Sequence, residues 1–303
     1  MRSAAARHQE DCVAPTITET KRGDATVVST QWLEEHLHNP LLAVVEITDD
    51  PSHIDERGTI PGATAVYWKH LLWHQSRREL VSATELSDRL LALGAGRGSI
   101  VVFAGEPTQF AAYAIWVSRV AGIAGTLHYL DGGLDAWRHA HADPPNAPQP
   151  IRDHQAALAA LAVTDPDLGQ VIDRNGVRER INSETVIVDL RSPEEFAGVR
   201  VAPATEPIDH GAQRHGRIPG ARPLHVRELL DEHGRILPTS ALQERISGLD
   251  AEEVSELVFY CRLSHRAALG WLIFTDVLGD PRVRVYDGSW TEWGSIVGTP
   301  IER

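Results

Sequence analysis

Two short motifs occur in the first half of the chain and recur, in the same order, in the second half. The turn at 60–63 (IPGA) returns at 218–221, 158 positions later. The segment 131–137 (DGGLDAW) returns at 287–293 (DGSWTEW), 156 positions later. Each motif alone is an ordinary turn or helix start, but an ordered pair at nearly one offset indicates a duplicated domain. A chain of 303 residues has room for two such domains.

Both halves alternate short apolar runs with longer stretches of helical pattern. The runs at 42–47, 100–103 and 186–190 predict strands, and the stretches at 84–93 and 111–120 predict helices. Short buried strands that alternate with helices are typical of a parallel sheet covered on both faces. The expected fold class is therefore α/β, with two tandem domains that are each a parallel sheet flanked by helices.

Cys261 lies where the apolar run 257–260 (LVFY) is expected to end as a buried strand. The apolar stretch after the following short loop predicts a helix. Backbone N–H groups and the positive end of a helix dipole converge at such a turn. Arg262, His265 and Arg266 follow within five residues. This setting favours the thiolate, which is the nucleophilic form of cysteine.

The first half has no cysteine at the matching position. An offset of 156 places Gly105 opposite Cys261, also at the end of an apolar run. The loop after it carries Glu106 where the second half has arginines. The first half therefore cannot perform thiolate chemistry here, and we expect it to pack against the second half and wall one side of its pocket.

These observations predict four segments along the chain. They are a flexible tail over 1–24, an inactive domain over 25–143, a linker over 144–166 and a catalytic domain over 167–303. The linker follows from a proline-dense run. Cys12 falls in the tail, and two cysteines in such different contexts do not suggest a disulfide.

Composition and charge exclude several classes of partner. The net charge of −13 disfavours nonspecific binding to nucleic acid or anionic membranes. No apolar run approaches the ~18 residues of a membrane span, and the N-terminus lacks the apolar core of a secretory signal. We therefore expect no nucleic-acid or membrane partner and a cytoplasmic location. His70 and His74 have the spacing of a helical metal pair, but no third ligand is evident, so we expect neither metal nor cofactor.

Taken together, the motifs resemble the tandem-domain rhodaneses, which are thiosulfate and 3-mercaptopyruvate sulfurtransferases. The resemblance rests on the IPGA turns, the DGG and DGS-W-x-x-W segments, the DLRSPEEF run at 189–196, and YCR before a short loop and a helix. It covers roughly 27–301. It implies an inactive N-terminal domain and a persulfide on Cys261. It further implies transfer of a sulfane sulfur from thiosulfate to cyanide or a thiol by double displacement.

The loop after the cysteine would hold the persulfide and the donor. Its N–H groups can stabilise an anionic sulfur, as in an anion nest. Arg262 and Arg266 suit a doubly charged donor because a guanidinium binds oxyanions through a planar fork, and the resemblance assigns substrate binding to Arg266. The other loop residues predicted to contact substrate are Leu263, Ser264, His265 and Ala267.

The loop is more similar to the C-R-x-G-E-R pattern of bacterial thiosulfate enzymes than to the C-G-S/A-G-V-T pattern of mercaptopyruvate enzymes. Three positions depart from it. Ser264 replaces a glycine, which adds strain if φ is positive. His265 replaces an acid, which predicts a more cationic rim and pH dependence near neutrality. Ala267 lacks a hydroxyl. Thiosulfate is the expected donor, and 3-mercaptopyruvate is the alternative.

Other functions share this arrangement of residues. A sulfur carrier without turnover would keep the same cysteine and arginines. Tyrosine-type phosphatases and arsenate reductases use Cys-x5-Arg, whereas Arg266 closes a shorter Cys-x4-Arg loop that suits a single sulfur atom. The expected partners are a small-molecule donor and acceptor, with a thiol protein such as thioredoxin as a further acceptor. We expect a monomer or weak dimer.

Two features have competing interpretations. Asp189 and Arg191 follow a strand, where a buried ion pair is favoured over a role in the site. The stretch 199–215 has no counterpart of similar length in the first half. It either lines the mouth of the active site or is a tolerated insertion.

Overall fold

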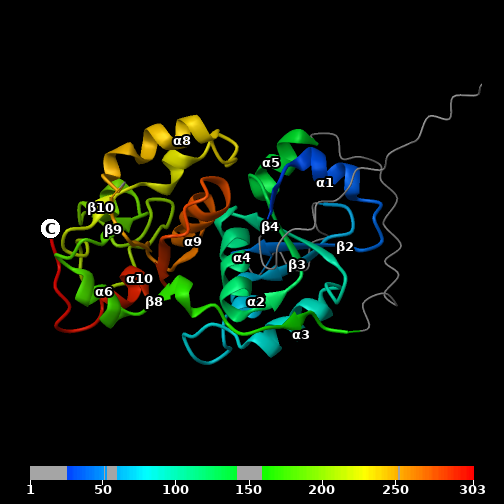
Figure 1. The fold of residues 1–303 in the computed structure, drawn as a ribbon, viewed down its shortest axis with the longest axis horizontal. Coiled ribbons are helices and arrows are strands. Elements are labelled where there is room, and N and C mark those ends of the chain that lie inside the picture. Colours follow the sequence, from blue (N-terminus) through cyan, green and yellow to red (C-terminus); the bar gives the residue numbers. More distant parts are fainter. Residues whose placement is uncertain (1–25, 51, 53–59, 142–158, 252) are drawn as a thin grey trace, which may run out of the picture.

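A computed structural model describes residues 26–50, 52, 60–141, 159–251 and 253–303. These residues form two five-stranded parallel sheets, each with helices on both faces (Figure 1). The predicted fold class is confirmed. The predicted tail over 1–24, Cys12 and most of the predicted linker lie outside the described residues.

The first domain is built around a sheet with the order β1-β6-β4-β2-β3. Its strands are β1 (Thr26–Val28), β2 (Leu42–Thr48), β3 (Thr64–Tyr67), β4 (Ile100–Glu106) and β6 (Thr126–Leu130). The helices are α1 (Thr30–His36), α2 (Trp68–Leu72), α3 (Ala83–Ala92), α4 (Gln109–Ala121) and α5 (Gly133–Ala140). Side chains of α1 and α5 share one apolar core with the sheet, and those of α2, α3 and α4 share another on the opposite face.

The second domain has a sheet with the order β10-β9-β11-β12-β8. Its strands are β8 (Val171–Ile172), β9 (Val186–Asp189), β10 (Arg222–Pro223), β11 (Leu257–Tyr260) and β12 (Val283–Tyr286). The α-helices are α6 (Arg174–Arg180), α7 (Pro193–Phe196), α8 (Thr239–Ile246), α9 (His265–Leu272) and α10 (Ser289–Trp293). When the strands of each domain are numbered in chain order, the first sheet has the spatial order 1-5-4-2-3, and the second sheet has the same order when it is read from β8. Duplication of one domain requires this match.

Shorter elements complete the structure. They are the 3₁₀ turns η2 (Leu168–Gln170), η3 (Val226–Leu229) and η4 (Ser247–Leu249), a π-helix η5 (Ile273–Val277), and the antiparallel pair β5 (Ile123–Ala124) and β7 (Ala162–Val163). The β5–β7 pair binds the chain entering the second domain to the end of α4.

The two domains pack through α4 and α9, which lie side by side (Figure 1). One cluster of buried apolar side chains continues from the first domain through this helix pair into the second. Beside it, Arg119 donates from Nη1 and Nη2 to the carboxylate of Asp276, at 3.1 and 3.0 Å. Asp131 accepts from the N–H of Ile236 at 2.8 Å. The predicted packing of the first domain against the second is confirmed.

The helical metal pair considered from the sequence does not form. Helix α2 ends at Leu72, so His70 and His74 do not share a helical face. In the described part of the chain, no group of three or more histidine, cysteine, aspartate or glutamate side chains is arranged to hold a metal ion. None of the described helices combines the length and hydropathy that a membrane span needs.

The interdomain carboxyl of Asp131 predicts a dependence of stability on pH. Burial raises its pKa from 3.8 to about 6. Between these values the unfolded chain loses the proton and the folded chain keeps it, so the contribution of Asp131 to stability falls as the pH rises from about 4 to about 6. Asp131→Asn cannot ionise and keeps an oxygen for Ile236. We expect it to raise the free energy of unfolding by about 2 kcal/mol at pH 8 and by little at pH 4.

Urea unfolding at the two pH values measures this difference. Asp88→Asn is the matched control because Asp88 is exposed on α3. An equal gain in both variants, or a gain that does not change with pH, would contradict the role assigned to Asp131.

Candidate active site

Cys261 directly follows β11, a central strand between β9 and β12, and its side chain is buried. Its backbone is held by the start of α10. The N–H of Cys261 donates to Ser289 Oγ at 3.2 Å, and its carbonyl accepts from the N–H of Trp290 at 2.9 Å. Since Ser289 and Trp290 belong to the DGSWTEW repeat, the duplicated motif fixes the backbone of the cysteine.

The loop after the cysteine is short and leads directly into α9, which begins at His265. The predicted strand-to-helix turn is therefore confirmed. The N–H groups in the first turn of a helix have no partner within that helix. The loop contains no proline, so each of its residues carries an N–H group. Such groups provide partial positive charge near the sulfur.

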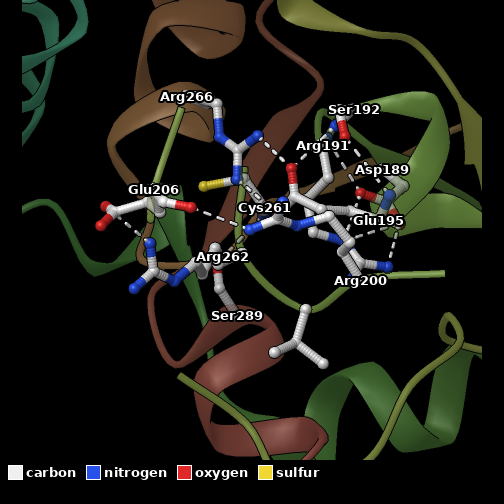
Figure 2. A network of polar contacts seen from close by, with 12 residues as sticks. Asp189, Arg191, Ser192, Glu195, Arg200, Glu206, Cys261, Arg262, Arg266 and Ser289 are labelled. Atoms are coloured by element: carbon white, nitrogen blue, oxygen red, sulfur yellow. Dashed lines mark hydrogen bonds and ion pairs between the residues drawn. The ribbon is translucent and has the colours of Figure 1, made fainter. Parts of the chain in front are cut away.

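Arg266 forms a buried bidentate ion pair with Glu195 of α7. Its Nη1 and Nη2 lie 2.7 and 2.9 Å from Oε2 and Oε1, and the Glu195 side chain is fully buried. Burial acts to lower the pKa of Arg266 and to raise that of Glu195. Their hydrogen bonds and opposite charges outweigh it, so the pKa of Arg266 is raised and that of Glu195 is lowered. The pair is therefore charged, and Figure 2 shows the guanidinium beside the Cys261 sulfur.

Glu195 was not singled out from the sequence, although a local signal was present. Ser192 and Glu195 form a capping box at the start of α7, in which the N–H of Ser192 donates to Glu195 Oε2 at 3.0 Å. The box explains why the carboxylate is fixed. That it faces Arg266, 71 positions away, depends on the tertiary fold.

Arg262 is bound by two side chains of the stretch 199–215. Its Nη1 lies 3.2 Å from Glu206 Oε1, and its Nη2 lies 3.0 Å from His210 Nδ1 (Figure 2 shows the pair with Glu206). Gly211 lets this stretch approach, because its φ is +114° and a Cβ there would lie 2.7 Å from Arg262 Nε. Of the two interpretations of the stretch, the one that lines the active-site mouth is confirmed.

Ser264 adopts a positive φ of 73°, the condition under which a serine is strained. Its hydroxyl donates to the carboxylate of Asp287 at 2.8 Å and contacts the Asp287 carbonyl. Asp287 also accepts from Arg78 and Tyr113 of the first domain, at 2.8 and 3.1 Å. The Ser264 side chain therefore faces the domain interface, and a substrate contact through its hydroxyl is not supported.

His265 lies in an aromatic box formed by the first domain. Its ring centroid is 4.3 Å from that of Trp68, 4.5 Å from that of Phe110 and 4.8 Å from that of Tyr113. The pKa of His265 lies well below its ordinary value, mainly because the ring is buried. Nearby cations lower this pKa further, and Arg78 has the largest effect among them. His265 is therefore neutral near pH 7. The prediction that it makes the rim more cationic and pH-dependent near neutrality is wrong.

A cavity of about 300 Å³ opens in front of Cys261 and is lined by both domains. Arg262, Leu263, His265 and Arg266 line it from the loop. Ala267 instead lies in the apolar core, so its side chain does not reach the cavity. The first domain contributes Asp49, Tyr67, Trp68, Lys69, Pro107, Gln109 and Phe110. The expectation that this domain walls one side of the pocket is confirmed.

The matching position in the first domain has no room for a side chain. A Cβ on Gly105 would lie 2.8 Å from both the Ala111 nitrogen and the Pro107 oxygen. Backbone atoms at that distance cannot give way without moving the loop. The first domain therefore lacks both the thiol and the space for one.

Asp189 and Arg191 form the buried ion pair favoured from the sequence. Both side chains are fully buried, with Arg191 Nη2 2.7 Å from Asp189 Oδ2. Tyr260, the residue before the cysteine, donates to the same oxygen at 2.6 Å. The pair therefore anchors the end of β11 and does not line the cavity.

Comparison with known proteins agrees with this geometry. A family model described as a rhodanese-like domain matches residues 29–140 and again 173–296. The chain belongs to the rhodanese family. The resemblance inferred from the motifs is therefore confirmed. The relatives described below are named as a sulfurtransferase and a sulfur carrier.

Two relatives match this chain over nearly the full length of both proteins. A protein of Saccharopolyspora erythraea named "Putative thiosulfate sulfurtransferase" is 33% identical over 287 residues, which cover 92% of this chain and 97% of that protein. "Sulfur carrier protein TtuD" of Thermus thermophilus is 31% identical over 287 residues, covering 91% and 96%. The solved structure of the Tum1 protein from Saccharomyces cerevisiae has a TM-score of 0.70 and 17% identity, covering 89% of this chain and 94% of that one. That likeness supports the fold alone.

The Arg266–Glu195 pair predicts a large loss of stability when the arginine is removed. Arg266→Met leaves the Glu195 carboxylate buried without its partner, so we expect the free energy of unfolding to fall by about 3 kcal/mol. Adding Glu195→Gln should recover part of this loss, because glutamine carries no charge. Arg262→Met is the control, with an expected cost below about 1 kcal/mol since Glu206 is partly exposed. Urea unfolding of the four proteins would refute the assignment if Arg262→Met cost as much as Arg266→Met.

The positive φ of Ser264 predicts an unusual order among substitutions. Ser264→Ala loses the bonds to Asp287 and keeps a Cβ in the left-handed region, whereas Ser264→Gly loses the bonds and relieves the strain. We expect the glycine variant to be more stable than the alanine variant by about 1 kcal/mol. Thermal and urea unfolding measure this order, and an alanine variant as stable as wild type would show that the hydroxyl contributes nothing.

Proposed function

We propose that this rhodanese is a thiosulfate sulfurtransferase that carries the transferred sulfur as a persulfide on Cys261. The observation that carries the proposal is the position of the cysteine. Its sulfur lies in a small cavity between two domains, beside a guanidinium that Glu195 holds in place. The positive charge of that guanidinium can stabilise the negative charge of a persulfide on Cys261.

The reaction proceeds in two displacements. The Cys261 thiolate attacks the outer sulfur of thiosulfate, the S–S bond of the donor breaks, and its electron pair leaves with sulfite. The enzyme then holds Cys–S–S⁻. Cyanide or a thiolate attacks the terminal sulfur, and the electron pair of the persulfide bond returns to Cys261 as thiolate. Charge is conserved in both steps, no metal or cofactor is required, and ping-pong kinetics are expected.

The charges around the cavity support an anionic donor. Lys69, Arg262 and Arg266 line it, and their N–H groups can donate hydrogen bonds to the negatively charged oxygens of thiosulfate. The alternative donor, 3-mercaptopyruvate, presents a single carboxylate. The proposed acceptors are cyanide or a small thiol, and also a thiol protein such as thioredoxin.

A second candidate is a sulfur carrier, favoured by the name of the Thermus thermophilus relative. A carrier would form the same persulfide and release it only to a protein partner. Turnover of thiosulfate with cyanide separates the two functions, because a carrier would show one transfer and no continuing cycle.

Intact mass spectrometry tests the persulfide. After incubation with thiosulfate we expect a gain of about 32 Da, the mass of one sulfur atom, which cyanide then removes. Cys261→Ser should show no gain and no sulfur transfer, while retaining its fold because only Sγ is replaced. Cys12 remains in that variant and is the internal control for a nonspecific thiol.

The possible results discriminate between the functions. A gain of mass with 3-mercaptopyruvate but not with thiosulfate would assign the alternative donor. Undiminished transfer in Cys261→Ser would refute the proposal. Hydrolysis of a phosphate ester that disappears in Cys261→Ser would favour a cysteine-dependent phosphatase.

A further inference from the structure

We propose that Lys69 of the first domain binds the oxyanion end of the sulfur donor, so that the domain without a cysteine contributes a substrate contact. The inference rests on the proposed function and extends it. The first domain would then bind the donor as well as line the cavity. No sequence motif indicated Lys69 as a binding residue.

The cations that line the cavity differ in whether a carboxylate pairs with them. Arg266 is bound on both Nη atoms by Glu195, and Arg262 is bound by Glu206 and His210. Within the described part of the chain, no carboxylate lies within ion-pair distance of Lys69. Among the lining residues that the structure describes, Lys69 is thus the cation that forms no ion pair with a described carboxylate.

Aromatic rings hold the ammonium group of Lys69. Lys69 Nζ lies 5.3 Å from the ring centroid of Trp68, 5.7 Å from that of Trp73 and 5.8 Å from that of Tyr67. Cation–π contacts attract an ammonium group without cancelling its charge. The aromatic rings therefore restrain an exposed side chain and leave its N–H donors available to an anion.

Lys69 is linked through Trp68 to the segment that follows Cys261. The Trp68 ring on which the ammonium rests is 4.3 Å from the ring of His265, the first residue of α9. The charge of Lys69 is also among those that lower the pKa of His265. Lys69 and Cys261 line the same cavity of about 300 Å³. A donor whose outer sulfur reaches Cys261 has its oxyanion end directed into the remaining space.

The balance of charge around the cavity also favours donor binding by Lys69. Among the described lining residues, Asp49 and Glu206 are acidic, and Lys69, Arg262 and Arg266 are cationic. Glu195, which binds Arg266 from outside the lining, adds a third acid, so the acidic and basic side chains are equal in number only when Lys69 is counted. Without Lys69 the acids would be in excess and would repel a dianionic donor, so the charge of Lys69 favours entry of the donor.

The test compares Lys69→Gln, Lys69→Arg and Arg77→Gln. Arg77→Gln is the matched control because it removes one positive charge nearby from an exposed side chain that does not line the cavity. For thiosulfate, we expect Lys69→Gln to raise KM by about five- to tenfold with kcat within about twofold. Lys69→Arg should restore most of the loss, and Arg77→Gln should stay within about twofold of wild type. The effect of Lys69→Gln should shrink at high salt.

The persulfide measurement distinguishes failure of this inference from failure of the proposed function. If Lys69→Gln forms the Cys261 persulfide at unchanged KM, Lys69 does not bind the donor, although the sulfurtransferase assignment stands. An equal rise of KM in Arg77→Gln, or a fall of kcat without a change of KM, would also overturn the inference. If wild type gains no sulfur from any donor, the proposed function itself fails.

Discussion

The ion pair between Arg266 and Glu195 is the interaction on which the candidate site depends. A guanidinium beside a buried sulfur is useful only if it stays charged and stays in place. Glu195 ensures both, since it binds two nitrogens of the guanidinium from a fully buried position. Its own position is fixed by the capping box with Ser192. The cation next to the reactive sulfur is thus held by a helix start in another part of the second domain.

The domain interface determines how the loop after Cys261 is held. Ser264 and His265 are departures from the family pattern, and both are bound on the side of the first domain. Ser264 bonds to Asp287, which Arg78 and Tyr113 also contact, and the ring of His265 lies against Trp68. Ser264 and His265 therefore contribute to the packing of the two domains. They would change donor binding only by changing the position of the loop after Cys261.

Duplication explains why a protein with one reactive cysteine contains two copies of the same sheet. The first copy cannot carry a thiol at Gly105, because backbone atoms of its own loop occupy the space. The first domain instead closes one side of the cavity and presents side chains towards it. Tyr67, Trp68 and Lys69 belong to this group, so the copy without a cysteine still contributes to the cavity around Cys261.

The sequence by itself determined the duplicated α/β fold and the position of Cys261 at a strand end. Both follow from local pattern and from the order of motifs, which the chain carries without reference to distant contacts. The buried pair of Asp189 and Arg191 was accessible for the same reason, since the two residues are two positions apart.

Only the tertiary structure decided which side chains surround the sulfur and what charge they carry. Glu195 lies 71 positions from Arg266, and Glu206 lies 56 from Arg262, so no local pattern could pair them. The charge of His265 was wrongly predicted because protonation depends on burial, and the side chains that bury it come from the other domain. Lys69 had no motif at all. Its place beside the cavity exists only because α4 and α9 pack the two domains together.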